Sequence, residues 1–385
     1  MSSTPFDELQ RISEESGVDE SLEFLESHFR DNKEFFKLFE VLKMKCRHQL
    51  GLPLIYSRQP DDLTDPQQRE LEDRLLSACR EVGTLFFESG MIQEGWMYLQ
   101  PVGDKRLNEK LVRSIESDQG NIDALIEVAL SQGAAPSYGL AILLQQYGTC
   151  DGITAFDTHA GRFDVDVQRD MASVLINHIH DELLKNVRQA LEESRPETLE
   201  QTMSLSQMVD AFPELPADGA GHIDPTHLSS AVRIARLLED PNDLSAAKQL
   251  ATYGSKLPED LQYPSATPFE NTYLDHDLFF SALLGQRVDQ AIQHFQSKTE
   301  SVDQEQFGPA AEETLVDLLA RVGRTNEALE FATQRLMGNE SALGIAPGVF
   351  EIAKSSAQLK KLGDVYRSQD DLLGFAMAVL KKPQD

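Results

Sequence analysis

Two histidines and an aspartate lie within six residues of each other, in the segment His222-Ile-Asp224-Pro225-Thr-His227. Two imidazoles and a carboxylate form a donor set that could hold a metal ion or bind a small ligand. The same segment is also typical of a helix start, because Asp224 can cap a helix that has Pro225 at its first position. We favour the helix start and expect no metal, and a binding site at this segment stays the alternative.

A segment with three prolines, residues 254–271, interrupts the helical spacing on either side of it. Long loops in compact proteins are usually functional or act as linkers. Two of its aromatic residues, Tyr263 and Phe269, are expected to be exposed. If the two helices that precede this loop fold back as a hairpin, the loop lies beside the histidine segment. The sequence therefore predicts a binding face made of His222, Asp224, His227, Tyr263 and Phe269.

No local signature of catalysis accompanies these residues. His178 and His180 are two apart on an expected helix, so they point about 200° from each other and cannot chelate one ion. Residues 275–277, Asp-His-Asp, indicate the start of another helix, where carboxylates favour the positive end of the dipole. The sequence contains no phosphate-binding loop, dinucleotide fingerprint, H-E-x-x-H or G-x-S-x-G motif. We predict no catalytic residue and no cofactor; a site assembled from distant helices would leave no local pattern.

The charge of the chain narrows its class of partners. Its 385 residues include 35 Lys and Arg against 64 Asp and Glu, which gives a net charge of −29. Nucleic-acid affinity depends on cations that neutralise phosphates, so we expect no nucleic acid as a partner. The acidity either maintains solubility or attracts a basic partner. A partner protein or peptide, with basic residues, is the class that this charge favours.

Hydropathy and cysteine usage point to the cytoplasm. No uninterrupted apolar stretch approaches the roughly 20 residues that cross a bilayer, and residues 140–144 form only a short one, so no membrane is expected. The first residues show neither a basic start nor an apolar stretch of the secretory kind. Cys46, Cys79 and Cys150 are far apart, which suggests reduced thiols.

Apolar residues recur at spacings of three and four almost throughout, which predicts an all-α protein. A first helix is expected at 21–30, and Asp31 could then cap a second helix. A long helix is expected at 67–88, with Gly90 at its end. Further hairpins are expected to turn near Gly133, Gly285 and Gly323.

One pattern recurs along the chain. In residues 313–336, Leu315 and Leu319 line one helix, Gly323 turns, and Asn326-Glu-Ala-Leu opens the next. Similar patterns occur at 278–295 and 82–101, and residues 362–366 read Leu-Gly-Asp-Val-Tyr. These segments resemble the tetratricopeptide repeat. The resemblance implies an α-solenoid of antiparallel helix hairpins that holds a peptide or partner protein on its surface.

We divide the chain accordingly into an N-terminal helical hairpin (1–60), a middle helical region (61–253), the proline-rich loop (254–271) and the repeat-like carboxyl-terminal part (272–385). The leading hypothesis is a protein-interaction scaffold or adaptor. The alternative is an all-helical enzyme or small-ligand-binding protein with its site near His222, Asp224, His227 and the Tyr263 loop.

Overall fold

The computed structural model describes residues 4–55, 63–194, 203–217, 222–301, 308–337 and 345–384. These residues fold into helices and loops, and no β-strand occurs among them. The all-α prediction is therefore confirmed for the described part of the chain. Contacts between Cα atoms divide the chain into two units, Met1–Gln146 and Tyr147–Asp385, which are described separately below.

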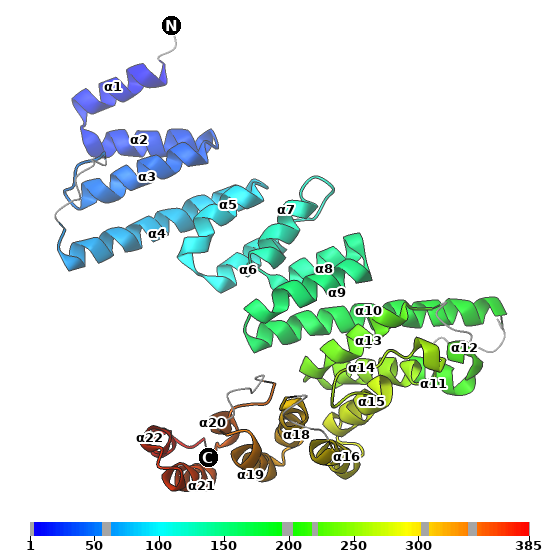
Figure 1. Cartoon of the computed structure of the whole chain (residues 1–385). Coiled ribbons are helices and arrows are strands. Elements are labelled where there is room, and N and C mark those ends of the chain that lie inside the picture. The colour runs from blue at the N-terminus through cyan, green and yellow to red at the C-terminus, as the bar shows by residue number, and fades with distance from the viewer. Residues whose placement is uncertain are drawn as a thin grey trace. The chain divides into compact units, whose positions relative to one another are not determined.

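The first unit is a series of helices in which neighbours along the chain pack on each other: α2 on α3, α3 on α4, and α4 on α5 (Figure 1). A 3-10 turn follows α5 at Gln100–Val102, and a π-helical turn follows α7 at Glu127–Ser131. The described helices are α1 (Pro5–Glu15), α2 (Val18–Asp31), α3 (Phe35–Gln49), α4 (Asp65–Glu88), α5 (Ile92–Leu99), α6 (Lys105–Arg113), α7 (Ile122–Ile126) and α8 (Pro136–Tyr147).

Three helices of this unit, α1, α4 and α6, start with a side-chain N-cap, at Thr4, Thr64 and Asp104. Thr64 and Gln67 form a capping box at the start of α4, close to the expected start of the long helix. The expected cap at Asp31 is wrong, because α2 runs on through Asp31 and the chain turns at Lys33, where φ is 56°.

Helices α4 and α5 cross so closely that two glycines are needed at the crossing. A Cβ atom at Gly83 would lie 2.6 Å from Leu99 Cγ, and one at Gly95 would lie 2.4 Å from Phe87 Cδ2. Both distances are far below normal carbon–carbon contact, so a larger residue at either position would push the helices apart.

In the second unit, α9, α13 and α14 pack against the long helix α10. Short 3-10 turns lie at Ala160–Arg162, Ala235–Leu237 and Glu259–Leu261. The described helices are α9 (Thr149–His159), α10 (Val165–Ser194), α11 (Leu205–Ala211), α12 (Glu214–Ala217), α13 (Pro225–Ile234), α14 (Pro241–Gly254), α15 (Thr272–Leu283), α16 (Val288–Ser301), α18 (Ala310–Arg321), α19 (Thr325–Arg335), α20 (Val349–Ile352), α21 (Ser356–Ser368) and α22 (Leu372–Leu380).

From α14 onward the packing is sequential. Contacts join α14 to α15, α15 to α16, α16 to α18, α18 to α19, α19 to α21, and α21 to α22 (Figure 1, yellow through red). The turns at Gly285 and Gly323 lie between α15 and α16 and between α18 and α19, as predicted, and both glycines have positive φ. Gly133, also at positive φ, precedes α8 in the first unit.

None of the helices in the described ranges combines the length and the apolar character that crossing a bilayer requires.

Candidate functional site

Asp224 acts as the N-cap of α13, as the sequence predicts. Its Oδ1 accepts hydrogen bonds from the Thr226 amide at 2.8 Å and from the Thr226 hydroxyl at 2.7 Å. These two bonds from Thr226 lower the pKa of Asp224, because both stabilise the ionised carboxylate. Pro225 occupies the first helical position. The carboxylate is thus engaged in starting a helix.

His222, which precedes α13, contacts both α14 and α10. Its Nδ1 lies 2.9 Å from the hydroxyl of Tyr253, a fully buried residue of α14. Its carbonyl oxygen accepts a hydrogen bond of 2.8 Å from Asn186 Nδ2 on α10. His227 lies half-buried on α13. Among the described residues, no group of three or more His, Cys, Asp or Glu side chains could hold a metal ion.

The hairpin expected before the loop does form, since α13 packs on α14. The two aromatic residues of the loop nevertheless separate. Tyr263 is 45% exposed, as expected, whereas Phe269 is only 1% exposed, so its expected exposure is wrong. The Phe269 ring stacks on His276 of α15 and lies 5.3 Å, centroid to centroid, from Phe295 of α16. Phe269 packs against aromatic residues of α15 and α16, because burying an aromatic ring is strongly favourable.

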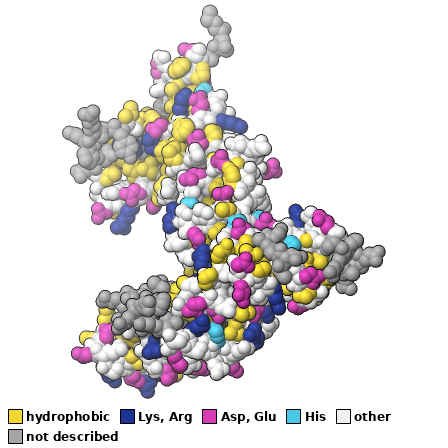
Figure 2. All heavy atoms as spheres, turned by 45° about the vertical axis from the view of Figure 1, so that its right-hand side comes forward, with side chains coloured by type: hydrophobic (Ala, Val, Ile, Leu, Met, Phe, Trp, Pro, Cys, Tyr) yellow, Lys and Arg dark blue, Asp and Glu magenta, His cyan; other side chains and the backbone are white. Residues whose placement is uncertain are grey.

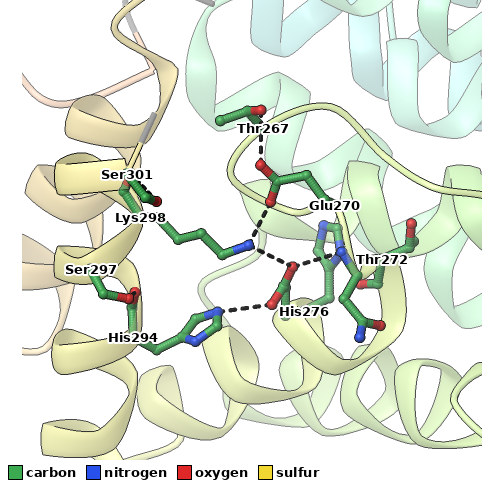
Figure 3. Close-up of polar contacts among 10 residues, drawn as sticks. Thr267, Glu270, Thr272, His276, His294, Ser297, Lys298 and Ser301 are labelled. Carbon is green, nitrogen blue, oxygen red and sulfur yellow. Dashed lines mark hydrogen bonds and ion pairs between the residues drawn. The ribbon is translucent and has the colours of Figure 1, made fainter. Parts of the chain in front are cut away.

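A set of polar contacts, centred on Asp275, ties the end of the loop to α15 and α16 (Figure 3). Asp275 is 3% exposed. Its Oδ1 accepts a hydrogen bond from His294 Nε2 at 2.8 Å, and its Oδ2 accepts one from the Asn271 amide at 2.9 Å. Lys298 Nζ lies 3.8 Å from Asp275 Oδ2. The buried carboxylate is thus satisfied by an amide, an imidazole and an ammonium group.

The loop side of this set is held by Glu270. Glu270 accepts hydrogen bonds from Lys298 Nζ at 2.6 Å and from the Thr267 hydroxyl at 2.9 Å (Figure 3). In sequence, His294 and Lys298 are four apart and so share one face of α16. That spacing was the sequence signal available for this cluster, but it does not indicate which carboxylate the two side chains contact.

His276 lies beside this cluster in a neutral form. It is 1% exposed, and its Nδ1 lies 2.5 Å from the carbonyl oxygen of Thr272. Burial, with a smaller contribution from the charge of Arg236, lowers the pKa of His276 to about 3. Its Nε2 is buried without a hydrogen-bond partner.

The Asp275–His294 pair has the geometry by which a carboxylate orients a general base. Catalysis would also need a nucleophile or substrate group at the free side of the imidazole. The nearby hydroxyl of Ser297 instead donates to the main-chain carbonyl of His294, at 2.7 Å. The arrangement therefore acts as a clamp that fixes the loop.

Helix α22 exposes several apolar side chains. Its sequence, LLGFAMAVL, contains no charged residue. Gly374 and Ala378 face α21 and are buried. The outer side chains are between 49% and 80% exposed, and all five are apolar: Leu372, Leu373, Met377, Val379 and Leu380. We call these five residues the α22 face. Exposed apolar patches of this kind mark interaction sites in monomeric proteins.

A groove of about 380 Å³ lies between α21 and α22. Its apolar lining includes Leu359, Phe375 and Val379, its basic lining comprises Lys360, Arg367 and Lys381, and its acidic lining is Asp364. The guanidinium of Arg367 lies 4.6 Å from the centre of the Phe375 ring, within the range of a cation–π contact. The groove thus combines apolar side chains with positive charge, and one of its residues, Val379, belongs to the α22 face.

Elsewhere, the charges are mixed. On the face drawn in Figure 2, acidic and basic side chains are interspersed within each unit. The net charge of −29 is therefore not gathered into one acidic patch on that face.

In comparisons with known proteins, no family model matches this sequence, and no curated protein matches it.

Proposed function

We propose that this chain is a protein-interaction module of stacked helix hairpins, and that its α21–α22 hairpin binds an amphipathic helix of a partner protein. The observation that supports this most directly is the α22 face, with five apolar side chains exposed on one helix. Helix-in-groove recognition places an apolar helix face against such a surface. The proposal includes the cytoplasmic location expected from the sequence.

The packing of this hairpin also supports the tetratricopeptide-like character of the proposal. Leu362 and Gly363 of the Leu-Gly-x-x-Tyr segment are buried on α21. A Cβ atom at Gly374 would lie 2.2 Å from Tyr366 Cδ1, so the tyrosine ring lies directly on the backbone of α22. Small residues at a close helix crossing are what a repeat of stacked hairpins requires.

Charge indicates the chemistry of the partner at this hairpin. The charged side chains that line the groove are three basic ones, Lys360, Arg367 and Lys381, and one acidic one, Asp364, an excess of positive charge within a chain of net charge −29. Complementary charge speeds association and suppresses wrong partners. A helix with acidic residues beside its apolar stripe therefore suits this groove, whereas the basic partner expected from the overall charge would bind another surface.

The test uses the full chain with a photo-crosslinking amino acid in place of Met377. We expect a crosslinked partner that is lost when Leu373 and Leu380 are both changed to serine. The matched control is Leu274→Ser, because Leu274 on α15 is also apolar and 55% exposed. A crosslink that the Leu373→Ser/Leu380→Ser variant retains contradicts the proposal.

A second copy of the chain is the other occupant that the experiment distinguishes. If the crosslinked species is a homodimer, and sedimentation shows a dimer that the double variant abolishes, the α22 face is a self-association surface. That result would replace the partner helix with a second copy.

A further inference from the structure

A second cavity, of about 460 Å³, lies within the carboxyl-terminal unit. It shares no lining residue with the α21–α22 groove. Its charged lining consists of four arginines and one aspartate: Arg169, Arg233, Arg236, Arg321 and Asp317. An excess of positive charge in a cavity is notable in a chain with a net charge of −29.

Three of the four arginines already have carboxylate partners. Arg233 Nη2 lies 2.9 Å from Asp157 Oδ2. Arg169 pairs with Glu239 at 2.6 Å and with Asp166 at 3.0 Å. These contacts hold both guanidinium groups at the wall of the cavity.

The third, Arg321, is fixed most firmly. Its Nη1 lies 3.4 Å from Asp317 Oδ2 and donates to the carbonyl oxygen of Arg236 at 2.7 Å. Its Nη2 donates to the carbonyl oxygen of Leu238. Burial raises the pKa of Asp317, because the cavity wall removes water from its carboxylate, and Arg321 opposes that rise.

Arg236 differs from the other three. Its Nε donates to the carbonyl oxygen of Arg233 at 3.1 Å, and its guanidinium carbon lies 4.8 Å from the centre of the Phe269 ring. In the part of the chain that the structure describes, Arg236 has no ion-pair partner, and its two Nη groups donate no hydrogen bond. It is a largely buried cation whose planar pair of donors is available to the cavity.

The electrostatics of Arg236 agree with this geometry. Burial, and then the like charge of Arg233, lower the pKa of Arg236 to about 10, and the charge of Asp317 only partly opposes this. A largely buried cation without a direct ion pair is costly, and an anion beside it would reduce that cost. The fork of two Nη groups matches the two oxygens of a carboxylate or phosphate.

The uncharged part of the cavity wall is mostly apolar and includes Phe156, Phe279, Leu237 and Ile345, with two polar side chains, Gln168 and Thr314, among them. Its volume lies within the roughly 300–1,000 Å³ typical of small-molecule sites. The geometry points to a binding site for a small organic anion, in which an oxyanion group pairs with Arg236 and an apolar body packs against these side chains. This inference does not depend on the partner-helix proposal.

Benzoate and phenyl phosphate are suitable probes, because each joins an oxyanion to an aromatic ring, and benzyl alcohol is the neutral control. With the full chain at constant ionic strength, titration calorimetry should show that at least one anion binds about tenfold or more tightly than benzyl alcohol. The comparison of the two anions shows whether carboxylate or phosphate is preferred. No binding of either anion at millimolar concentration, or equal binding of benzyl alcohol, overturns the inference.

Arg236→Gln should weaken binding of the anion by at least about tenfold. The matched control is Arg324→Gln, since Arg324 is exposed and pairs with Asp289 away from the cavity lining. Unchanged affinity in Arg236→Gln overturns the inference.

If Arg236→Gln fails to fold, two further measurements test whether Arg236 binds the anion. Arg236→Lys keeps the charge but removes the fork, so it should fold and bind the anion more weakly than the wild-type chain. In the wild-type chain, the bound anion should protect Arg236 from modification by phenylglyoxal, measured by mass spectrometry. Arg324 should be modified equally with and without the anion. Absence of protection at Arg236 contradicts an oxyanion site there.

Discussion

The ring of Phe269 lies flat against the imidazole of His276, with 4.2 Å between ring centroids and 20° between ring planes. This contact joins the last residues of the proline-rich loop to the first turns of α15. Phe279 adds an edge contact at 5.7 Å. The loop is therefore anchored by an aromatic core at one end and exposes Tyr263 nearer its middle.

Replacing Phe269 with alanine should lower the free energy of unfolding by about 3–5 kcal/mol, because it leaves a cavity in a well-packed aromatic cluster. Tyr263→Ala is the control from the same loop, and its effect should stay within about 0.5 kcal/mol, since the ring is half-exposed. Urea denaturation followed by circular dichroism measures both. Equal losses in the two variants would contradict the anchoring role of Phe269.

His276 should make stability depend on pH. Its pKa is lowered from 6.5 to about 3 in the folded chain, so the unfolded chain takes up the proton first as pH falls. The stability associated with neutral His276 is complete above about pH 6.5 and is lost progressively toward pH 3, at up to about 1.4 kcal/mol per pH unit. Unfolding free energies should therefore fall between about pH 6.5 and 5, where most carboxylates are still ionised.

The His276→Gln variant should show a shallower fall over that pH range than the wild-type chain. His227→Gln serves as the matched substitution, because His227 lies only half-buried, on α13. An unaltered slope in His276→Gln would mean that other groups cause the pH dependence.

Asp275→Asn should destabilise the chain by about 1–3 kcal/mol, because an amide cannot accept all three contacts that the buried carboxylate makes. Asp289→Asn is the control: Asp289 pairs with Arg324 but is 91% exposed, so its loss should cost under about 0.5 kcal/mol. Thermal or urea unfolding distinguishes the two. A neutral Asp275→Asn variant would show that the clamp contributes nothing to stability.

Gly95→Ala should destabilise the first unit by about 1–3 kcal/mol, although alanine is the better helix former by about 1 kcal/mol. The reason is the 2.4 Å approach of a new Cβ to Phe87. Gly161→Ala has open space around it and should be close to neutral. Comparing unfolding midpoints tests this, and a stabilised Gly95→Ala variant would be inconsistent with the close crossing of α4 and α5.

Binding of an acidic partner helix at the α21–α22 groove should weaken as salt rises. The screening length falls from about 10 Å at 0.1 M to about 3 Å at 1 M, which reduces the attraction of Lys360 and Arg367. Changing both residues to glutamine should mainly slow association, measured with the crosslinked partner once identified. A salt-independent affinity would leave the apolar α22 face as the sole source of binding.

The sequence by itself determined the all-α class and many of the turns. These features depend on local signals: apolar spacing of three and four, glycine at positive φ in the turns at Gly285 and Gly323, and the Asp224-Pro225 pair that starts α13. The local signal was misleading at Asp31. An aspartate can cap a following helix, but it can also be the last residue of the preceding one, and Asp31 is the last residue of α2.

Only the tertiary structure decided which side chains are buried and which charged groups pair. Both depend on which distant segments of the chain come into contact. Phe269 is buried only because α15 and α16 bring His276 and Phe295 around it. Asp275 gains its partner His294 from the next helix, a pairing that no local pattern indicates. Arg236 is left without a carboxylate because the acidic residues of its neighbourhood pair with Arg169, Arg233 and Arg321 instead. Competition of this kind between long-range contacts depends on three-dimensional distances, which residue order does not contain.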